Sequence, residues 1–500
     1  MKLVSVLYLL SSAVMATDDT TTISHENCDA NALPAENTSV STLNNGHFYK
    51  MCPGSHQYSN SGKFATFGQP RCGDGSNFAF YLTRPEQPQE EEKILIELSG
   101  GGACWDKTTC TLQSSLLKMP PFDFMLGMSC SDMGKIAQAS EGWDILCART
   151  VGQTDFTEYT TVVLPYCTQD VHLGDAEATY DKTNVKHVGA HNTYRTLQWV
   201  FDNFEDPSHI VLTGCSAGAT PLPVVYHMIN EHYKARGRNV EIDIIADSPV
   251  YLSPSKFLEN YFHSWNHETV MKWIGFDYDT YKKDVEYPNK LLDFVLDSSE
   301  DNDSFGYVSH KNDPISIMYF SAMGGEQGEG GVDIVGDMEG GEATDNITLG
   351  LSTPTSVQTE WWRQMNNSWS QAMNEHENFD VFIMDGSGHC STGLYFPTQK
   401  PDFETWVANL IDETSSATLL TTVQQNTVTN ASVTTTTDAT ATAEAYEPEP
   451  SDKPVLPTSN SFPSFASVTD APSTATTTAS AGYTFITTML FFQFALFWFG

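Results

Sequence analysis

Short apolar runs alternate along the middle of the chain with longer segments in which apolar residues recur at helical spacing. The short runs predict strands at 93–98, 161–165, 209–213, 242–247, 314–320 and 379–384. The helical spacing predicts helices at 191–204, 220–235 and 359–375. Alternation of this kind is typical of an α/β fold, in which helices cover both faces of a mostly parallel sheet. Residues 28–92 contain three cysteines and many Gly and Ser, which predicts an irregular, disulfide-bearing N-terminal covering.

One predicted strand leads into the sequence Gly-Cys-Ser-Ala-Gly at residues 214–218, and a predicted helix follows. Gly214 and Gly218 would let the strand and the helix approach closely, and the tight turn would project the Ser216 hydroxyl into solvent. The helix dipole would favour negative charge developing beside this hydroxyl. A packed turn of small residues is the alternative. The strand before and the helix after favour the nucleophile elbow of an α/β hydrolase.

A second predicted strand, 93–98, runs into the glycine loop, residues 99–105, with the sequence Ser-Gly-Gly-Gly-Ala-Cys-Trp. Bare backbone of this kind can turn its N–H groups toward a substrate carbonyl oxygen. Gly101 or Gly102 would supply one donor, and Ala217, the residue after the nucleophile, would supply the other. A flexible turn without a ligand is the alternative for this segment taken alone.

A histidine follows the last predicted strand, where α/β hydrolases place their general base. The strand 379–384 leads into Asp-Gly-Ser-Gly-His-Cys at residues 385–390. Fourteen histidines occur in the chain, and His389 is the one in a glycine-rich loop after this strand, from which it could reach Ser216. A structural histidine is the alternative.

Four segments in this order resemble the pectin acetylesterase family. They are the glycine loop with Cys104 and Cys110, the run 165–175, the elbow at 214–218 and the closing 388–390. The resemblance covers roughly residues 45–410.

The resemblance implies a serine carboxylesterase that removes an acyl group from an oxygen ester, usually acetyl from a cell-wall polysaccharide. It implies Ser216 as the nucleophile, His389 as the base, and Gly101, Gly102 and Ala217 as the oxyanion site. It implies no cofactor.

The third member of the triad departs from the family pattern. Relatives place an aspartate just after the strand that precedes the histidine segment, and here a glycine falls at about that position. Glu326 is the nearest carboxylate and is the first candidate, since the acid need only orient the imidazole and stabilise the imidazolium. Asp247, at the end of the predicted strand 242–247, is the second. Asp313 precedes the predicted strand 314–320, which would place it at the wrong end of the sheet.

The charge balance limits the partners. The chain has 63 acidic and 25 basic residues, a net charge of −38. No basic stripe is present to offset phosphate repulsion, which argues against nucleic acid as a partner. Heavily de-esterified pectin would also be repelled unless salt or divalent cations screened it. A neutral acetylated glycan fits the charge equally well, and a surface kept soluble is the simplest interpretation.

Both ends of the chain predict export. Residues 1–16 resemble a secretory signal peptide, residues 17–92 form the N-terminal covering and residues 93–412 the catalytic domain. Residues 413–474 are rich in Thr, Ser, Ala and Pro and predict a disordered, O-glycosylated stalk. The hydrophobic tail 475–500 favours a cleaved GPI signal over a single membrane span, because no basic residue follows it. Either would attach the protein to the outer leaflet of a membrane.

Ten cysteines are consistent with disulfides in a secreted protein, although their pairing stays open. Cys215, inside the elbow, is the strongest candidate for a free thiol. Asp170, His172 and Asp175 are too slight a cluster to indicate a metal. Sequons fit a glycoprotein and occur at Asn37, Asn302, Asn346, Asn366 and Asn430.

Two rival functions remain open. A lipid deacylase would need a deep apolar pocket for a long acyl chain, whereas acetyl needs a shallow one. A catalytically silent glycan-binding protein of the cell surface is consistent with the stalk and the missing aspartate. The presence of Ser216, His389 and the glycine loop argues against a protein without catalytic activity.

Overall fold

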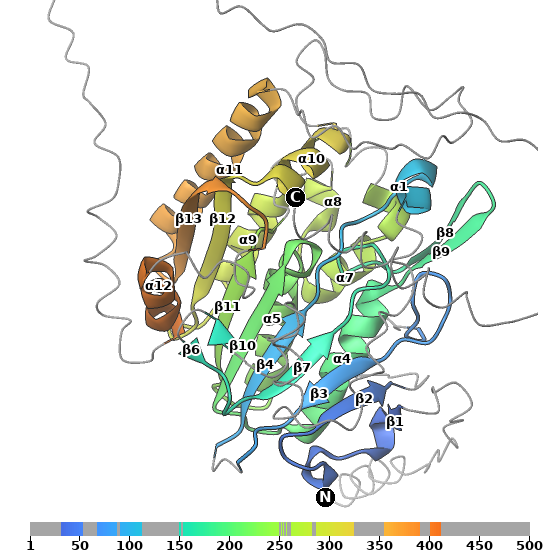
Figure 1. The fold of residues 1–500 in the computed structure, drawn as a ribbon, viewed down its shortest axis with the longest axis vertical. Helices are drawn as coiled ribbons and strands as arrows, with labels where there is room; N and C mark the ends of the chain where they lie inside the picture. Colours follow the sequence, from blue (N-terminus) through green and yellow to red (C-terminus); the bar gives the residue numbers. More distant parts are fainter. Residues whose placement is uncertain are drawn as a thin grey trace, which may run out of the picture. The chain divides into compact units, whose positions relative to one another are not determined.

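The computed structural model describes the greater part of the region between residues 32 and 411 (Figure 1). The described residues are 32–53, 68–87, 91–112, 150–151, 154–249, 252, 254, 257, 262–282, 287–324, 355–390 and 401–411. All of them belong to one compact unit, Met1–Thr427. The predicted signal peptide, stalk and hydrophobic tail lie outside the described residues.

The centre of the unit is a nine-stranded sheet, with the order β1-β2-β3-β7-β4-β10-β11-β12-β13. In this spatial order, all the strands from β7 to β13 are parallel to one another. β3 runs antiparallel to both of its neighbours, β2 and β7. The bounds are β1 Leu33–Pro34, β2 Phe48–Cys52, β3 Phe80–Thr83, β7 Thr160–Leu164, β4 Lys93–Leu98, β10 His209–Cys215, β11 Glu241–Asp247, β12 Phe305–Asn312 and β13 Phe379–Ser387. The mostly parallel sheet is therefore confirmed, and β1 to β3 show that the N-terminal segment extends it.

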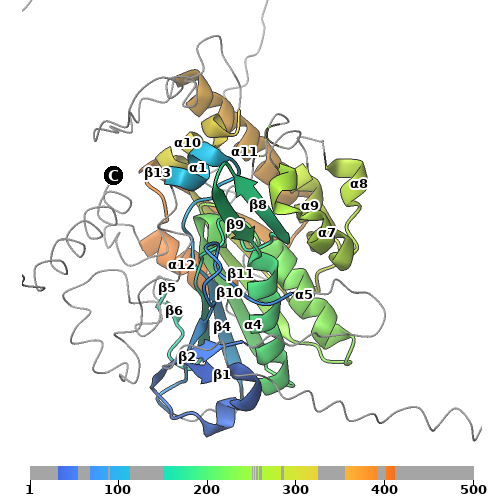
Figure 2. The same cartoon turned by 90° about the vertical axis from the view of Figure 1, so that its right-hand side faces the viewer.

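Helices cover both faces of the sheet, as the alternation predicted (Figure 2). Side chains on β4 alternate between two apolar clusters: Ile94 and Ile96 point to one, and Leu95 to the other. The first cluster includes residues of α4 (Gly189–Asn203), α5 (Leu222–Lys234), α9 (Tyr287–Leu296) and α11 (Thr355–Glu375). The second is covered by α12 (Pro401–Ile411).

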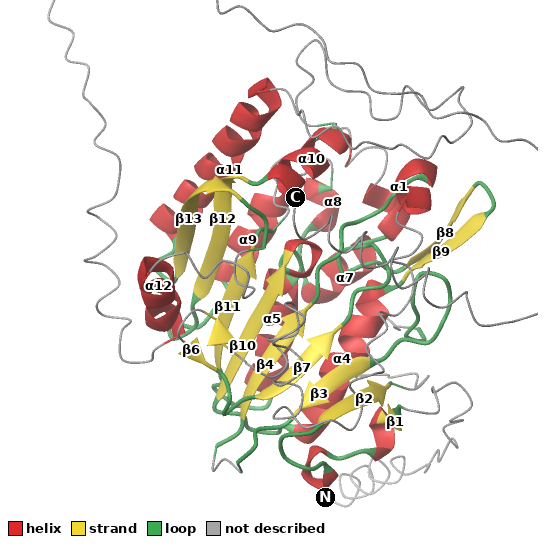
Figure 3. Cartoon of the chain, in the orientation of Figure 1, coloured by secondary structure: helices red, strands yellow, loops and turns green. Residues whose placement is uncertain are grey.

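The remaining elements lie mostly around the carboxyl ends of the parallel strands, the upper edge of the sheet in Figure 3. They include α1 (Lys107–Leu112), the hairpin of β8 (Ala176–Tyr180) and β9 (Thr183–His187), α7 (Glu268–Ile274), α8 (Tyr278–Tyr281) and α10 (Pro314–Ala322). A small ribbon of β5 (Thr150–Val151) and β6 (Thr154–Asp155) lies apart from them, near α12. The described part of the chain contains no helix that is long and apolar enough to cross a bilayer.

The prediction of a strand at 314–320 is wrong, because this run forms α10. Asp313 caps the helix: one of its carboxylate oxygens accepts hydrogen bonds from the backbone N–H of Ile315 and Ser316. Pro314 at the first helical position favours the same start. The strand of this region is β12, which ends at Asn312, one residue before Asp313. Asp313 therefore lies at the carboxyl end of the sheet and not at the opposite end.

Candidate active site

The turn after β10 has the geometry of a nucleophile elbow. Ser216 has a φ of +56°, in the left-handed region that side chains rarely adopt. A Cβ added to Gly214 would lie 2.6 Å from the carbonyl oxygen of Gly218, and one added to Gly218 would lie 1.9 Å from that of Leu98. The close approach predicted for these two glycines is therefore present. Without it, β4 and the elbow could not lie side by side.

The Ser216 side chain points into a pocket and not freely into solvent, since the residue is only 5% exposed. The pocket has a volume of about 90 Å³, and Gly102 and Ala217 line it together with Ser216. Its other walls are mainly apolar and include Trp105, Phe257, Trp265, Met271, Leu292 and Met323. The pocket therefore offers apolar surface beside Ser216, Gly102 and Ala217.

The glycine loop has the backbone that an oxyanion site needs. Gly101 has a φ of +150° and Gly102 of +78°, conformations that favour glycine. Their N–H groups donate to no other described residue. Ala217 is the second residue of a short 3₁₀ turn, Ser216–Gly218, where N–H groups have no partner within the helix. Among the described residues these N–H groups have no acceptor, so they are available as donors, and their role as an oxyanion site stays a prediction.

His389 faces a buried carboxylate on the neighbouring strand end. Its Nδ1 lies 2.9 and 2.8 Å from the two carboxylate oxygens of Asp313, which is fully buried. Burial by itself lowers the pKa of His389, but the Asp313 carboxylate, with a further contribution from the charge of Asp247, raises it above its ordinary value. The pair thus has the orientation in which a carboxylate fixes the imidazole tautomer and leaves Nε2 to act as a base.

Asp313 was not expected at the site, because the predicted strand at 314–320 would place it at the wrong end of the sheet, and this run is a helix instead. An Asp-Pro pair before an apolar run is typical of a helix start, and this signal could have identified Asp313 as a residue at a strand end. Glu326 lies outside the described residues, so its assignment stays a prediction. Asp247 is buried at the end of β11, where its carboxylate accepts from Ser248 Oγ at 2.9 Å.

Comparison with known proteins gives a match over the segment that holds the glycine loop and the elbow. A model of the pectinacetylesterase family matches residues 64–286. The match covers slightly less than half of the chain. Asp313 and His389 lie beyond this family segment, and the structure brings them to the same end of the sheet.

Similar proteins include two curated relatives. The palmitoleoyl-protein carboxylesterase NOTUM of Schmidtea mediterranea is 28% identical over 204 residues, and notum2 of Xenopus laevis is 27% identical over 150 residues. The matches cover 39% and 30% of this chain, and the chain spans only 36% and 28% of these relatives. The structure of the Wnt deacylase Notum from Drosophila superposes with a TM-score of 0.43 and 15% identity, over 67% of this chain and 86% of that one.

A disulfide joins the elbow to the loop that carries His389. Cys215, the residue before Ser216, is bonded to Cys390, the residue after His389, so the prediction of a free thiol at Cys215 is wrong. A ring nitrogen of His389 and the two sulfur atoms lie within 4.8 Å of one another. The backbone N–H of Cys390 also donates to Ser248 Oγ at 3.1 Å. These contacts hold His389 beside the elbow.

Removal of this disulfide should therefore lower the activity even under conditions in which the variant remains fully folded. We expect the double variant Cys215→Ala/Cys390→Ala to lose about 10²-fold in kcat/KM, the effect typical of a displacement of about 1 Å in a catalytic group. The assay is ester hydrolysis at a temperature where circular dichroism shows the variant fully folded. A folded double variant with unchanged kcat/KM would show that the disulfide does not position His389.

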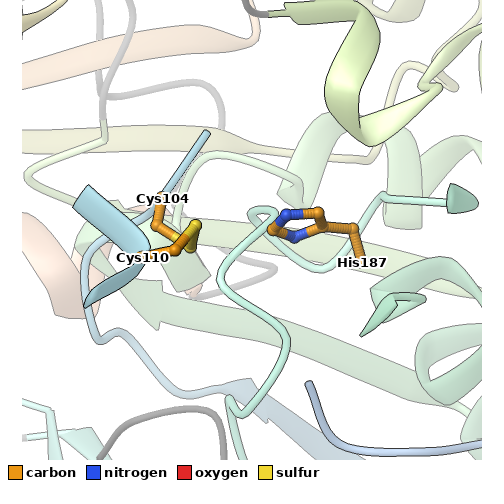
Figure 4. A group of neighbouring side chains, drawn as sticks. All are labelled: Cys104, Cys110 and His187. Atoms are coloured by element: carbon orange, nitrogen blue, oxygen red, sulfur yellow. A yellow bond between two sulfur atoms is a disulfide. The ribbon is translucent and has the colours of Figure 1, made fainter. Parts of the chain in front are cut away.

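A second sulfur-containing cluster includes Cys104, near the end of the glycine loop (Figure 4). Cys104 and Cys110 face His187, but their sulfur atoms form a disulfide and are not thiolate ligands. The His187 ring nitrogens lie 2.9 Å from the Thr168 carbonyl oxygen and 2.9 Å from the Tyr180 hydroxyl. Burial lowers the pKa of His187 to about 4. The cluster is therefore structural as it stands.

The polar residues of the run 165–175 contact separate partners. Asp170 accepts from the Gly189 N–H at 2.7 Å, and His172 Nε2 lies 2.9 Å from the Ser99 carbonyl oxygen. Asp175 pairs with His191 at 2.7 Å. The slight Asp-His-Asp cluster noted in the sequence thus resolves into three structural contacts.

Proposed function

We propose that this protein is a serine carboxylesterase with Ser216 as nucleophile, His389 as general base and Asp313 as the orienting acid. The support is the arrangement at the ends of β10, β12 and β13. There the buried Asp313 carboxylate contacts His389, and the Cys215–Cys390 disulfide holds this histidine beside the elbow. The pectinacetylesterase-family segment supports the same class of reaction.

The reaction proceeds in two acyl-transfer steps. His389 accepts the Ser216 proton as the hydroxyl attacks the ester carbonyl, and N–H groups of the glycine loop and of Ala217 stabilise the oxyanion. The alcohol leaves with the proton held by His389. Water, activated by the same imidazole, then hydrolyses the acyl-enzyme. Asp313 stabilises the imidazolium in both steps.

The pocket favours an acyl group larger than acetyl. Aromatic and aliphatic side chains form most of the wall beside Ser216, and burial of methylene groups against such a wall is favourable by about 0.8 kcal/mol for each CH₂. A fatty-acyl ester is therefore the substrate that the geometry supports best. Acetylated polysaccharide, favoured by the sequence and by the family name, is the second candidate. In either case we place the enzyme outside the cell, on the strength of the export signals predicted at both ends.

The test is hydrolysis of p-nitrophenyl acetate, butyrate, octanoate and palmitate by the full-length secreted protein. A fatty-acyl pocket predicts that kcat/KM rises from acetate to at least octanoate. Leu291, a half-buried residue of the pocket wall, offers a matched pair. Leu291→Trp should lower kcat/KM for octanoate and leave acetate unchanged, whereas Leu291→Ala should retain octanoate turnover. Highest activity on acetate, insensitive to Leu291→Trp, would favour the acetylesterase.

A further inference from the structure

The run 165–175 contains a strained segment whose role the triad does not explain. In residues 169–172, here called the support loop, three residues that are not glycine have positive φ: Gln169 at +57°, Val171 at +50° and His172 at +61°. Such conformations are costly and persist where the surrounding structure imposes them, often at functional sites. The support loop is buried throughout.

The support loop contacts the glycine loop at three points. His172 Nε2 lies 2.9 Å from the Ser99 carbonyl oxygen, and the Cys104 N–H donates to the Gln169 carbonyl oxygen at 3.0 Å. Between them, Gln169 Nε2 donates to the Gly101 carbonyl oxygen at 3.0 Å. Burial lowers the pKa of His172 to about 4, so its ring is neutral near pH 7. The two ends and the middle of the glycine loop are therefore tied to one rigid segment.

The middle contact decides where an oxyanion donor points. The Gly101 carbonyl and the Gly102 N–H belong to one planar trans peptide and point in opposite directions. A peptide between two glycines can rotate easily, because both residues adopt positive and negative φ. Since Gln169 holds the carbonyl on one side, the Gly102 N–H is held on the other, and Gly102 lines the pocket with Ser216.

Gln169 makes this contact at a cost. Its side chain is fully buried, and its Oε1 has no hydrogen-bond partner among the described residues. The amide cannot turn over to satisfy Oε1, because Oε1 would then face the Gly101 carbonyl, which only accepts. A buried acceptor without a partner is costly, as is the backbone strain of the support loop.

We propose that Gln169 is a positioning residue, which fixes the Gly101–Gly102 peptide so that the Gly102 N–H stays aimed at the substrate oxyanion. The proposal rests on the proposed esterase function. It assigns to the Gln169 amide a role in transition-state stabilisation without contact with the substrate. Replacement of the amide should therefore lower kcat and leave substrate binding unchanged.

The test uses two variants, Gln169→Leu and Gln169→Met, each of which removes the donor to the Gly101 carbonyl. Each should reduce kcat on p-nitrophenyl butyrate by about 10²-fold, the effect typical of losing one oxyanion donor, and change KM little. A trifluoromethyl ketone, which forms an oxyanion adduct with the serine, should bind more weakly by the same factor. The methyl ketone of equal length should bind as it does to wild type.

A buried amide far from the glycine loop provides the control. Asn230 on α5 donates to the Ser298 carbonyl oxygen at 3.3 Å, and Asn230→Leu should lower stability without lowering kcat of the folded protein. If wild type is active and folded Gln169 variants keep wild-type kcat, the inference about Gln169 is overturned and the esterase stands. If wild type shows no turnover that depends on Ser216, both fail together.

Discussion

Replacement of Ser216 by alanine is expected to reduce kcat for p-nitrophenyl butyrate by about 10⁶-fold, the loss typical of removing the nucleophile of a catalytic triad. Without the hydroxyl no acyl-enzyme can form, and the oxyanion donors retain only a small acceleration over water. The measurement is kcat under saturating substrate. Ser216 is buried and the change is small, so thermal unfolding should be close to that of wild type.

Thr213 offers a matched control on β10, the strand that leads into Ser216. Its hydroxyl is buried and donates to the Ile245 carbonyl oxygen at 3.2 Å, away from the pocket. Thr213→Val should therefore retain activity although it also removes a hydroxyl. Equal turnover by Ser216→Ala and wild type would mean that another residue is the nucleophile or that no covalent step occurs.

The second large effect is expected at Asp313. Asp313→Asn should reduce kcat by about 10⁴-fold, because the amide stabilises the wrong imidazole tautomer and cannot stabilise the imidazolium. Asparagine also caps helices, so α10 should keep its start and the folded structure should persist. The same assay on Glu326→Gln separates the two candidate acids. A large loss at Glu326 with little at Asp313 would restore the assignment made from sequence.

The pH profile gives an independent reading of the same pair. The base must be neutral to act, so kcat/KM falls as the pH drops through the pKa of His389. Since Asp313 raises that pKa above its ordinary value, the acidic limb of wild type should lie above pH 6.5. In Asp313→Asn the attraction is lost while burial remains, so the limb should move to lower pH. If the acidic limb of Asp313→Asn moved to higher pH instead, the contact between His389 and Asp313 would be contradicted.

Much of the site follows from local sequence pattern. The elbow and the glycine loop are each written in a few consecutive residues, because a tight turn and a bare backbone both demand glycine at fixed positions. His389 follows from its place after the last strand. The strands around these motifs were also predictable, since buried parallel strands are short continuous apolar runs.

Identification of the orienting acid depended on where β12 ends and α10 begins. The run 314–320 is apolar on all sides, which suits a buried strand and a buried helix equally well, and periodicity cannot separate them. β12 was not predicted, because its sequence mixes polar and apolar residues and so lacks the continuous apolar run of a buried strand. The Cys215–Cys390 disulfide and the pocket wall join segments that are far apart in the chain. Their proximity is set by the order of strands in the sheet, which no local pattern encodes.

The mass of the peptide that contains Ser216, measured during turnover, tests the proposed acyl-enzyme most directly. The full-length protein is mixed with excess p-nitrophenyl octanoate, quenched in acid within the first turnovers, digested and analysed by mass spectrometry. We expect an octanoyl group on Ser216, a matching burst of p-nitrophenol, and neither in Ser216→Ala. Steady hydrolysis with Ser216 unmodified, or with the acyl group on another residue, would contradict the assignment of Ser216, His389 and Asp313 as the catalytic triad.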